Sequence, residues 1–266
     1  MKFYNQKVVR TGPYIEIWQY SKPIITHSDE SIIPTDFLDE KQHRFDFDEL
    51  TSEEQKERLH RMENNRLRAK WRLLRIIDCN YDDRTSFLTL TTKENIKDRA
   101  TFLLMLKTFI KRFNYQIFHT KKSELKYVAV LEKQKRGAYH THILLFDVPF
   151  IKHSQLLKIW GHGAVRLNRV DVDSKDNRGR YVTKYFEKGI GQELLDSFGK
   201  KSYFASRNLK KPTEDKILLN ENLEFDQSVV LYETTYVSKI YRDNQLIDNP
   251  VRYRKIKYTE DKNNGL

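Results

Sequence analysis

Two histidines and one glutamate stand at spacings that could form a metal site. His140 and His142 are two residues apart in a segment rich in β-branched and aromatic residues. Successive side chains of a β-strand point to opposite faces, so these two imidazoles would share one face. If a hairpin turns at Arg136, Glu132 lies directly opposite His140 and diagonal to His142, about 5 Å and about 7–8 Å away at Cβ. Two imidazoles and a carboxylate at such separations could bind one divalent cation.

The register of that hairpin is itself part of the prediction. Residues 134–138 separate two runs rich in valine, isoleucine, leucine and aromatic residues, and they suit a short hairpin loop. A slip of one residue would move Glu132 to the opposite face of the sheet. Two histidines could also share a polar sheet face by chance. The glutamate at the matching position is what favours a metal site over that interpretation.

A second group of candidate residues lies in the segment RYVTKYFEKG, residues 180–189. Tyr181 and Tyr185 are four residues apart, so a helix would place both on one face, with Lys184 beside them. Phenol hydroxyls next to an ammonium group suit nucleophilic attack on a phosphodiester. The lysine can offset phosphate charge and lower the pKa of a phenol from its usual value of about 10. Packing of these aromatic residues against a sheet is the competing interpretation, and for this segment taken alone it is the commoner one.

The elements that would position these residues form a regular series from residue 86 onwards. Alternating apolar residues predict strands, and apolar residues three or four apart predict helices. The series is a strand at 87–92, a helix at 96–113, hairpin strands at 127–133 and 139–146, a helix at 154–160, a strand at 164–172 and a helix from about 180 to 188. The hairpin strands must pair antiparallel. The predicted fold class is therefore α+β, with helices packed against a largely antiparallel sheet of about five strands.

The sequence on either side of this series is predicted to form extensions. Thr51 and Glu54 stand at capping-box spacing and predict the start of a basic helix that runs to about Ile77. Two further strands are expected near the C-terminus, in SVVLYETTYVSKIY and VRYRKIKY. The predicted domains are an N-terminal extension at 1–80, with a strand, an acidic linker and the basic helix, a core at 81–212 and a β-rich C-terminal extension at 213–266.

Composition narrows the function class. The chain carries 49 lysines and arginines against 37 aspartates and glutamates, a formal net charge of +12, which favours a polyanionic partner such as nucleic acid. Cys79 is the only cysteine, which excludes an internal disulfide and fits a reducing compartment. No run is apolar and long enough for a signal peptide or a membrane span. We therefore expect a cytoplasmic protein, in a bacterial host cell, with no membrane partner.

Three motifs, in this order, resemble those of the HUH-type single-strand endonucleases, in particular the rolling-circle replication initiators of phages and plasmids. FLTLT at 87–91 is similar to the first motif of that family, HTH at 140–142 to its paired-histidine motif, and YVTKY at 181–185 to the tyrosine motif of its two-tyrosine branch. The resemblance covers residues 86–212, and it implies the HUH or ferredoxin-like arrangement of sheet and helices. Thr141 departs from the family pattern, which usually has a bulky hydrophobic residue there. A β-branched threonine also suits a strand.

The resemblance implies an enzyme that nicks single-stranded DNA at a replication origin. His140, His142 and Glu132 would hold Mg²⁺ or Mn²⁺, although imidazole ligands also suit other divalent metals. Tyr181 would attack first and leave a 5′-phosphotyrosine link and a free 3′-OH, and Tyr185 would serve a second transfer that rejoins strands. The remaining implied site residues are Lys184 near the phosphate and, for DNA binding, Lys135, Arg136, Arg178 and Arg180. A host helicase and a polymerase are the expected protein partners.

Other functions remain open from the sequence. A two-tyrosine transposase or a mobilisation relaxase would use the same chemistry. A nucleic-acid-binding protein on the same scaffold would bind without cleaving and would form no covalent adduct. A zinc hydrolase would use the histidine pair with water as the nucleophile, and it would leave the tyrosine segment unexplained.

Overall fold

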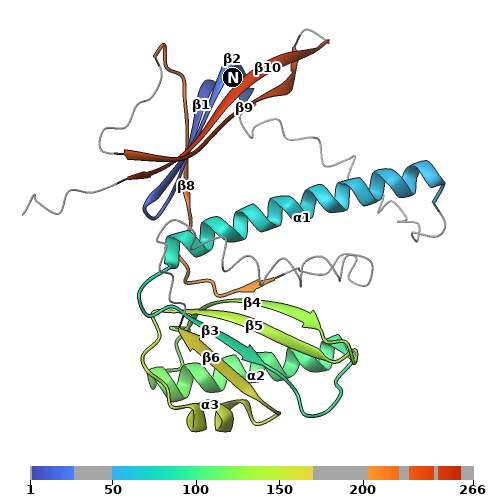
Figure 1. Ribbon diagram of the computed structural model, residues 1–266, viewed down its shortest axis with the longest axis vertical. Coiled ribbons are helices and arrows are strands. Elements are labelled where there is room, and N and C mark those ends of the chain that lie inside the picture. The colour runs from blue at the N-terminus through green and yellow to red at the C-terminus, as the bar shows by residue number, and fades with distance from the viewer. Residues whose placement is uncertain (1, 27–49, 170–202, 222–227, 243–244, 259–266) are drawn as a thin grey trace, which may run out of the picture. The chain divides into compact units, whose positions relative to one another are not determined.

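The structure, a computed structural model, describes residues 2–26, 50–169, 203–221, 228–242 and 245–258. The chain divides into two units, one formed by residues 1–59 and 212–266 and the other by residues 60–211. Each unit contains a five-stranded antiparallel sheet, and the architecture is α+β, as predicted (Figure 1). None of the helices in the described ranges has the length and apolar character that a membrane span requires.

The sheet in residues 60–211 has the strand order β6-β3-β5-β4-β7. Its strands are β3 (Ser86–Leu90), β4 (Lys126–Lys133), β5 (Tyr139–Phe146), β6 (Val165–Arg169) and β7 (Phe204–Ala205). The predicted hairpin is confirmed as β4 and β5, and β5 is the central strand between β3 and β4. The edge strands are β6 and β7, which precede and follow the undescribed residues 170–202.

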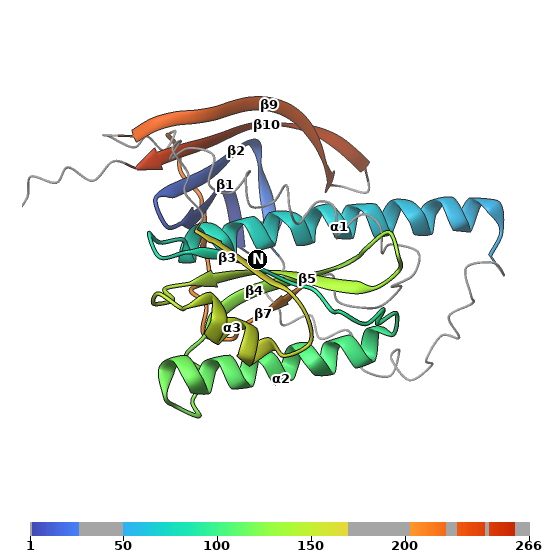
Figure 2. The ribbon, with the colours of Figure 1, turned by 60° about the horizontal axis from the view of Figure 1, so that its bottom comes forward.

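Helices cover both faces of this sheet (Figures 1 and 2). Helices α2 (Arg99–Phe118) and α3 (His153–Trp160) pack on one face. The C-terminal part of α1 (Ser52–Asn80) packs on the other face through Leu73 and Ile77. The fully buried side chains on the α2 and α3 side include Leu88, Leu90, Phe102, Phe109, Ile143 and Trp160. On the α1 side they include Leu73, Ile77, Val128, Val130, Leu144 and Phe146.

Capping explains where α2 begins and ends. The Asp98 carboxylate accepts a hydrogen bond from the Thr101 backbone N–H at 2.7 Å, which satisfies a donor of the first turn. The helix ends at His119, which is left-handed with φ 53° and donates its N–H to the Tyr115 carbonyl. The helix therefore spans residues 99–118 rather than the predicted 96–113.

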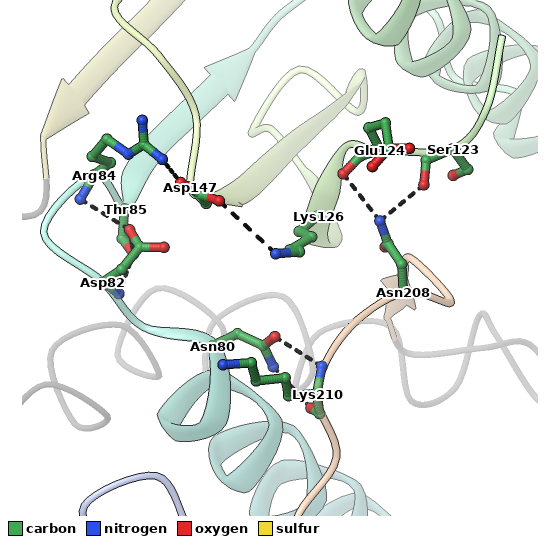
Figure 3. Close-up of polar contacts among 10 residues, drawn as sticks. All are labelled: Asn80, Asp82, Arg84, Thr85, Ser123, Glu124, Lys126, Asp147, Asn208 and Lys210. Atoms are coloured by element: carbon green, nitrogen blue, oxygen red, sulfur yellow. Dashed lines mark hydrogen bonds and ion pairs between the residues drawn. The ribbon is translucent and has the colours of Figure 1, made fainter. Parts of the chain in front are cut away.

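Polar contacts fasten the segment after β7 to the rest of the unit (Figure 3). Asn80, the last residue of α1, donates from Nδ2 to the Lys210 carbonyl at 2.9 Å and accepts from the Lys210 N–H at 2.9 Å. Asn208 Nδ2 donates to the carbonyls of Ser123 and Glu124, at 2.9 and 3.0 Å, just before β4. The chain is thus anchored beside β4 shortly after residues 170–202.

The sheet in residues 1–59 and 212–266 has the strand order β8-β1-β2-β10-β9. Its strands are β1 (Lys2–Thr11), β2 (Tyr14–Thr26), β8 (Thr213–Ile217), β9 (Ser228–Arg242) and β10 (Gln245–Tyr258). The two predicted C-terminal strands are confirmed as β9 and β10. The N-terminal β2 pairs with β10, so segments from opposite ends of the chain share one sheet.

Candidate metal centre

Glu132, His140 and His142 meet at one point on the α1 side of the β4–β5 hairpin. The Nε2 atoms of His140 and His142 lie 3.0 and 2.9 Å from Glu132 Oε2, and they lie 3.0 Å from each other. His140 is buried, and the other two side chains are only slightly more exposed. Within the described residues these three form the group of side chains that could hold a metal ion.

The predicted hairpin register is what brings these residues together, and the structure has that register. Glu132 pairs directly with His140, and Val130 pairs with His142, so the carboxylate is diagonal to the second imidazole. The loop closes with a hydrogen bond from the Gln134 N–H to the Ala138 carbonyl at 2.8 Å. Gly137 occupies a position with φ 85°, where a side chain would strain the backbone.

Strand β3 orients His142. Thr89 pairs with His142 across the sheet, and its hydroxyl lies 3.1 Å from Nδ1 of the imidazole. The Phe87 ring stacks on the same imidazole, with centroids 5.4 Å apart and planes 20° apart. A metal-binding histidine commonly uses its second nitrogen to hold one tautomer and ring orientation, which Thr89 can do here. The alternation in FLTLT predicted that Phe87 and Thr89 share a face, but their roles depend on the β3–β5 register, which the local pattern does not reveal.

The threonine between the two histidines faces the opposite side of the sheet. Thr141 is fully buried there, and its hydroxyl donates to the Val130 carbonyl at 2.9 Å. Its polar group is therefore satisfied inside the core. The departure from the usual hydrophobic residue at this position leaves the two imidazoles on one face.

Burial sets the protonation state of His140. Desolvation lowers the pKa of the His140 imidazole and the neighbouring His142 lowers it further, while the Glu132 carboxylate raises it by less. The net shift is below the ordinary value of 6.5, so the neutral form predominates near neutral pH. The neutral imidazole is the form that binds metal. Among the described residues, His140 Nδ1 has no hydrogen-bond partner.

Hydrogen bonds alone do not account for the three contacts. A neutral imidazole nitrogen carries either a proton or a lone pair. If both Nε2 atoms donate to Glu132 Oε2, their protons face each other across 3.0 Å. If one Nε2 lacks its proton, its lone pair faces the carboxylate oxygen at 3.0 Å or less. A cation between the three atoms would make every contact favourable, so the donor set fits a divalent metal.

Of the predicted DNA-binding residues, the structure describes Lys135 and Arg136 in the hairpin loop. Lys135 is exposed. The Arg136 guanidinium donates to the carbonyls of Thr92 and Lys93, at 2.5 and 3.3 Å, and so ties the hairpin loop to the end of β3. The other predicted residues, Arg178, Arg180, Tyr181, Lys184 and Tyr185, lie outside the described residues.

Residues 85–190 match the model of a protein family described as replication-associated protein ORF2. The matched range contains the metal centre and all three sequence motifs. The match supports membership of a rolling-circle replication initiator family and a role in DNA replication. No significant match to the chain was found among curated proteins or among solved structures.

Proposed function

We propose that this chain initiates rolling-circle DNA replication by nicking single-stranded DNA at an origin, and that it later rejoins the strands. The observation that carries the proposal is the convergence of Glu132, His140 and His142 at one point within the segment that matches a replication family. Such families act on DNA, and the net charge of +12 is compatible with a nucleic-acid partner.

Glu132, His140 and His142 would hold Mg²⁺ or Mn²⁺. Octahedral coordination with bonds of about 2.1 Å separates neighbouring ligand atoms by about 3.0 Å, whereas tetrahedral zinc separates them by about 3.4 Å. The observed separations of 2.9 and 3.0 Å support the octahedral ions. When bound, the ion supplies positive charge that offsets the charge developing on the scissile phosphate.

The tyrosine segment would supply the nucleophile. The Tyr181 hydroxyl oxygen forms a bond to phosphorus while the bond from phosphorus to the 3′ oxygen breaks. The phenol proton is lost, and the leaving 3′ oxygen takes up a proton to give a free 3′-OH. Lys184 would reduce the charge on the phosphate. Tyr185 would carry the second transfer, and the covalent link keeps the energy of the phosphodiester so that rejoining needs no ATP.

The substrate would be unpaired at the nick, because both the carboxylate–histidine face and a tyrosine must reach the same phosphate. Lys135 and Arg136 stand in the loop next to the metal centre, and Arg178 and Arg180 precede Tyr181 in the sequence. These four would follow the DNA backbone. A host helicase would open the duplex, and a host polymerase would extend the 3′-OH.

A labelling experiment tests the proposal. The full chain is incubated with labelled single-stranded oligonucleotides that tile the replicon encoding it, with Mn²⁺ or with EDTA, and adducts are resolved on a denaturing gel. We expect an adduct that requires Mn²⁺ and that is absent from His140→Ala and Tyr181→Phe. His162→Ala, a change of an exposed histidine outside the metal centre, is the matched control and retains the adduct.

Each alternative gives a different result in the same experiment. DNA binding without any adduct would overturn the nicking proposal in favour of a non-cleaving binding protein. Full adduct formation by Tyr181→Phe, together with loss in Tyr185→Phe, would move the first attack to Tyr185. Cleavage without a protein adduct would indicate a hydrolase that uses water.

A further inference from the structure

One face of the sheet in residues 1–59 and 212–266 carries aromatic side chains from three neighbouring strands. In β2 and β10, Trp18 pairs with Tyr253, and Tyr20 pairs with Val251, which in turn pairs with Tyr236 of β9. Lys255 of β10, two residues after Tyr253, pairs with Tyr232 of β9. Residues two apart on a strand and residues directly opposed across strands share a face. We call the face formed by Trp18, Tyr20, Tyr232, Tyr236 and Tyr253 the aromatic face.

The rings of the aromatic face lie next to one another. The Trp18 and Tyr253 ring centroids are 5.0 Å apart, and those of Tyr232 and Tyr253 are 6.1 Å apart. The strands that carry them, β2, β10 and β9, lie side by side in Figure 2. The rings therefore form a continuous surface rather than isolated aromatic residues.

The aromatic face is partly open to solvent. Tyr232 is 52% exposed and Tyr236 is 45% exposed, and Trp18, Tyr20 and Tyr253 are half-buried. The opposite face of the same sheet holds the apolar cluster of Val8, Ile15, Ile17 and Ile256, all of which are buried. The exposed tyrosines on β9 thus lie on the face opposite the one that carries this unit's aliphatic core.

Lysines are interleaved with these rings. Lys7 Nζ lies 5.3 Å from the Trp18 ring centroid, Lys255 Nζ lies 4.6 Å from that of Tyr14, and Lys216 Nζ lies 5.4 Å from that of Tyr4. A surface that offers flat ring faces beside ammonium groups matches the two chemical components of single-stranded nucleic acid. Unpaired bases can stack on the rings, while the phosphates approach the lysines.

We propose that the aromatic face binds single-stranded DNA without sequence preference. Tyr232, Tyr236 and Trp18 would stack unpaired bases, and Lys7 and Lys255 would lie near phosphates. This surface is outside residues 85–190 and is separate from the metal centre, so the proposal does not depend on nicking. Duplex DNA would not use it in this way, because its bases are already stacked and paired.

The test measures binding of a fluorescein-labelled 20-nucleotide oligo(dT) to the full chain by anisotropy, at low salt and in EDTA. The variant Tyr232→Ala/Tyr236→Ala removes two exposed rings, and we expect its dissociation constant to rise about 10- to 100-fold. Tyr241→Ala is the matched control. Tyr241 is also an exposed tyrosine of β9, but it lies an odd number of residues from Tyr236 and faces the other way. We expect it to bind as the unaltered chain does.

Two further variants separate stacking from an effect on folding. Tyr232→Phe/Tyr236→Phe keeps both rings, so its affinity should stay within about twofold of the unaltered chain. Tyr232→Ala alone should lose part of the affinity while its far-ultraviolet circular dichroism is unchanged. EDTA and a homopolymer without an origin make the result independent of the nicking proposal.

Three results would overturn the proposal. The first is unchanged oligo(dT) affinity in Tyr232→Ala/Tyr236→Ala. The second is an equal loss of affinity in the control Tyr241→Ala, or an equal loss for duplex DNA. The third is a loss of binding to oligo(rU) with oligo(dT) binding unchanged, which would assign the surface to RNA.

Discussion

Among the three candidate metal ligands, Glu132 is the one whose side chain brings a negative charge to the ion. Glu132→Gln keeps the size of the side chain and its place opposite His140, but it removes that charge and one strong donor. We expect Mn²⁺ affinity, measured by isothermal titration calorimetry on the full chain, to fall by about 100-fold or more, because even residues that only support a ligand contribute about 10- to 100-fold. Glu94→Gln alters an exposed glutamate elsewhere and should bind Mn²⁺ normally. Unchanged Mn²⁺ binding by Glu132→Gln would mean that the ion does not use this carboxylate.

Thr89 acts on the ion only through His142. Thr89→Val keeps a β-branched side chain of similar size on β3 but removes the hydroxyl that lies 3.1 Å from His142 Nδ1. The imidazole then loses the partner that holds its tautomer and orientation, and we expect Mn²⁺ affinity to fall about 10-fold. Calorimetry gives the affinity. The melting temperature without metal should change little, and a loss of melting temperature with full Mn²⁺ affinity would indicate a purely structural role.

At the scale of the elements, the loop between α3 and β6 supports the end of β3 through a close backbone approach. A Cβ on Gly163 would meet the backbone of Thr91, Thr92 and Lys93, with Lys93 N only 2.7 Å away. Gly163→Ala should therefore lower the free energy of unfolding by about 1–3 kcal/mol, as overpacking does. Gly161→Ala is the matched comparison. It also has a positive φ, of 70°, but its Cβ would meet only Lys158 O at 3.8 Å, so we expect a loss of about 1 kcal/mol. Thermal and urea unfolding measure both values, and equal losses would contradict the predicted clash.

How far the sequence predicts these elements depends on how local their causes are. The β4–β5 hairpin and the meeting of Glu132 with His140 follow from a short loop and the two-residue period of a strand, and both are confirmed. The start of α2 was predicted three residues early, because the Asp98 cap was not recognised.

Contacts between distant segments have no comparable local signal. Strands β1 and β8 were not predicted. Their pairing joins residues such as Val8 and Asp215, which no short pattern connects. The contact of Thr89 with His142 likewise depends on a register between strands that are separated by a whole helix. The roles of Tyr181, Lys184 and Tyr185 stay predictions.

At the scale of the whole molecule, the unit in residues 60–211 is continuous in sequence, whereas the other unit combines both ends of the chain. The β2–β10 pairing closes that second unit. Removal of residues 228–258 would therefore take away two of the five strands of one sheet but none of the strands that carry Glu132, His140 and His142. Metal binding and the aromatic face thus depend on different parts of the fold.

This division predicts that the two activities can be separated by mutation. Tyr232→Ala/Tyr236→Ala should weaken binding of single-stranded DNA while its Mn²⁺ affinity, measured by calorimetry, equals that of the unaltered chain. Glu132→Gln should do the reverse, because its side chain lies outside the sheet that carries the aromatic face. For nicking, the aromatic-face variant should raise the DNA concentration needed for half-maximal adduct formation, with the rate at saturating DNA unchanged. Glu132→Gln should lower the rate at every DNA concentration, because a charge that stabilises the transition state is not replaced by more substrate. If instead the aromatic-face variant lowered Mn²⁺ affinity, or the rate at saturating DNA, the two units would not act independently and the assignment of separate roles would be wrong.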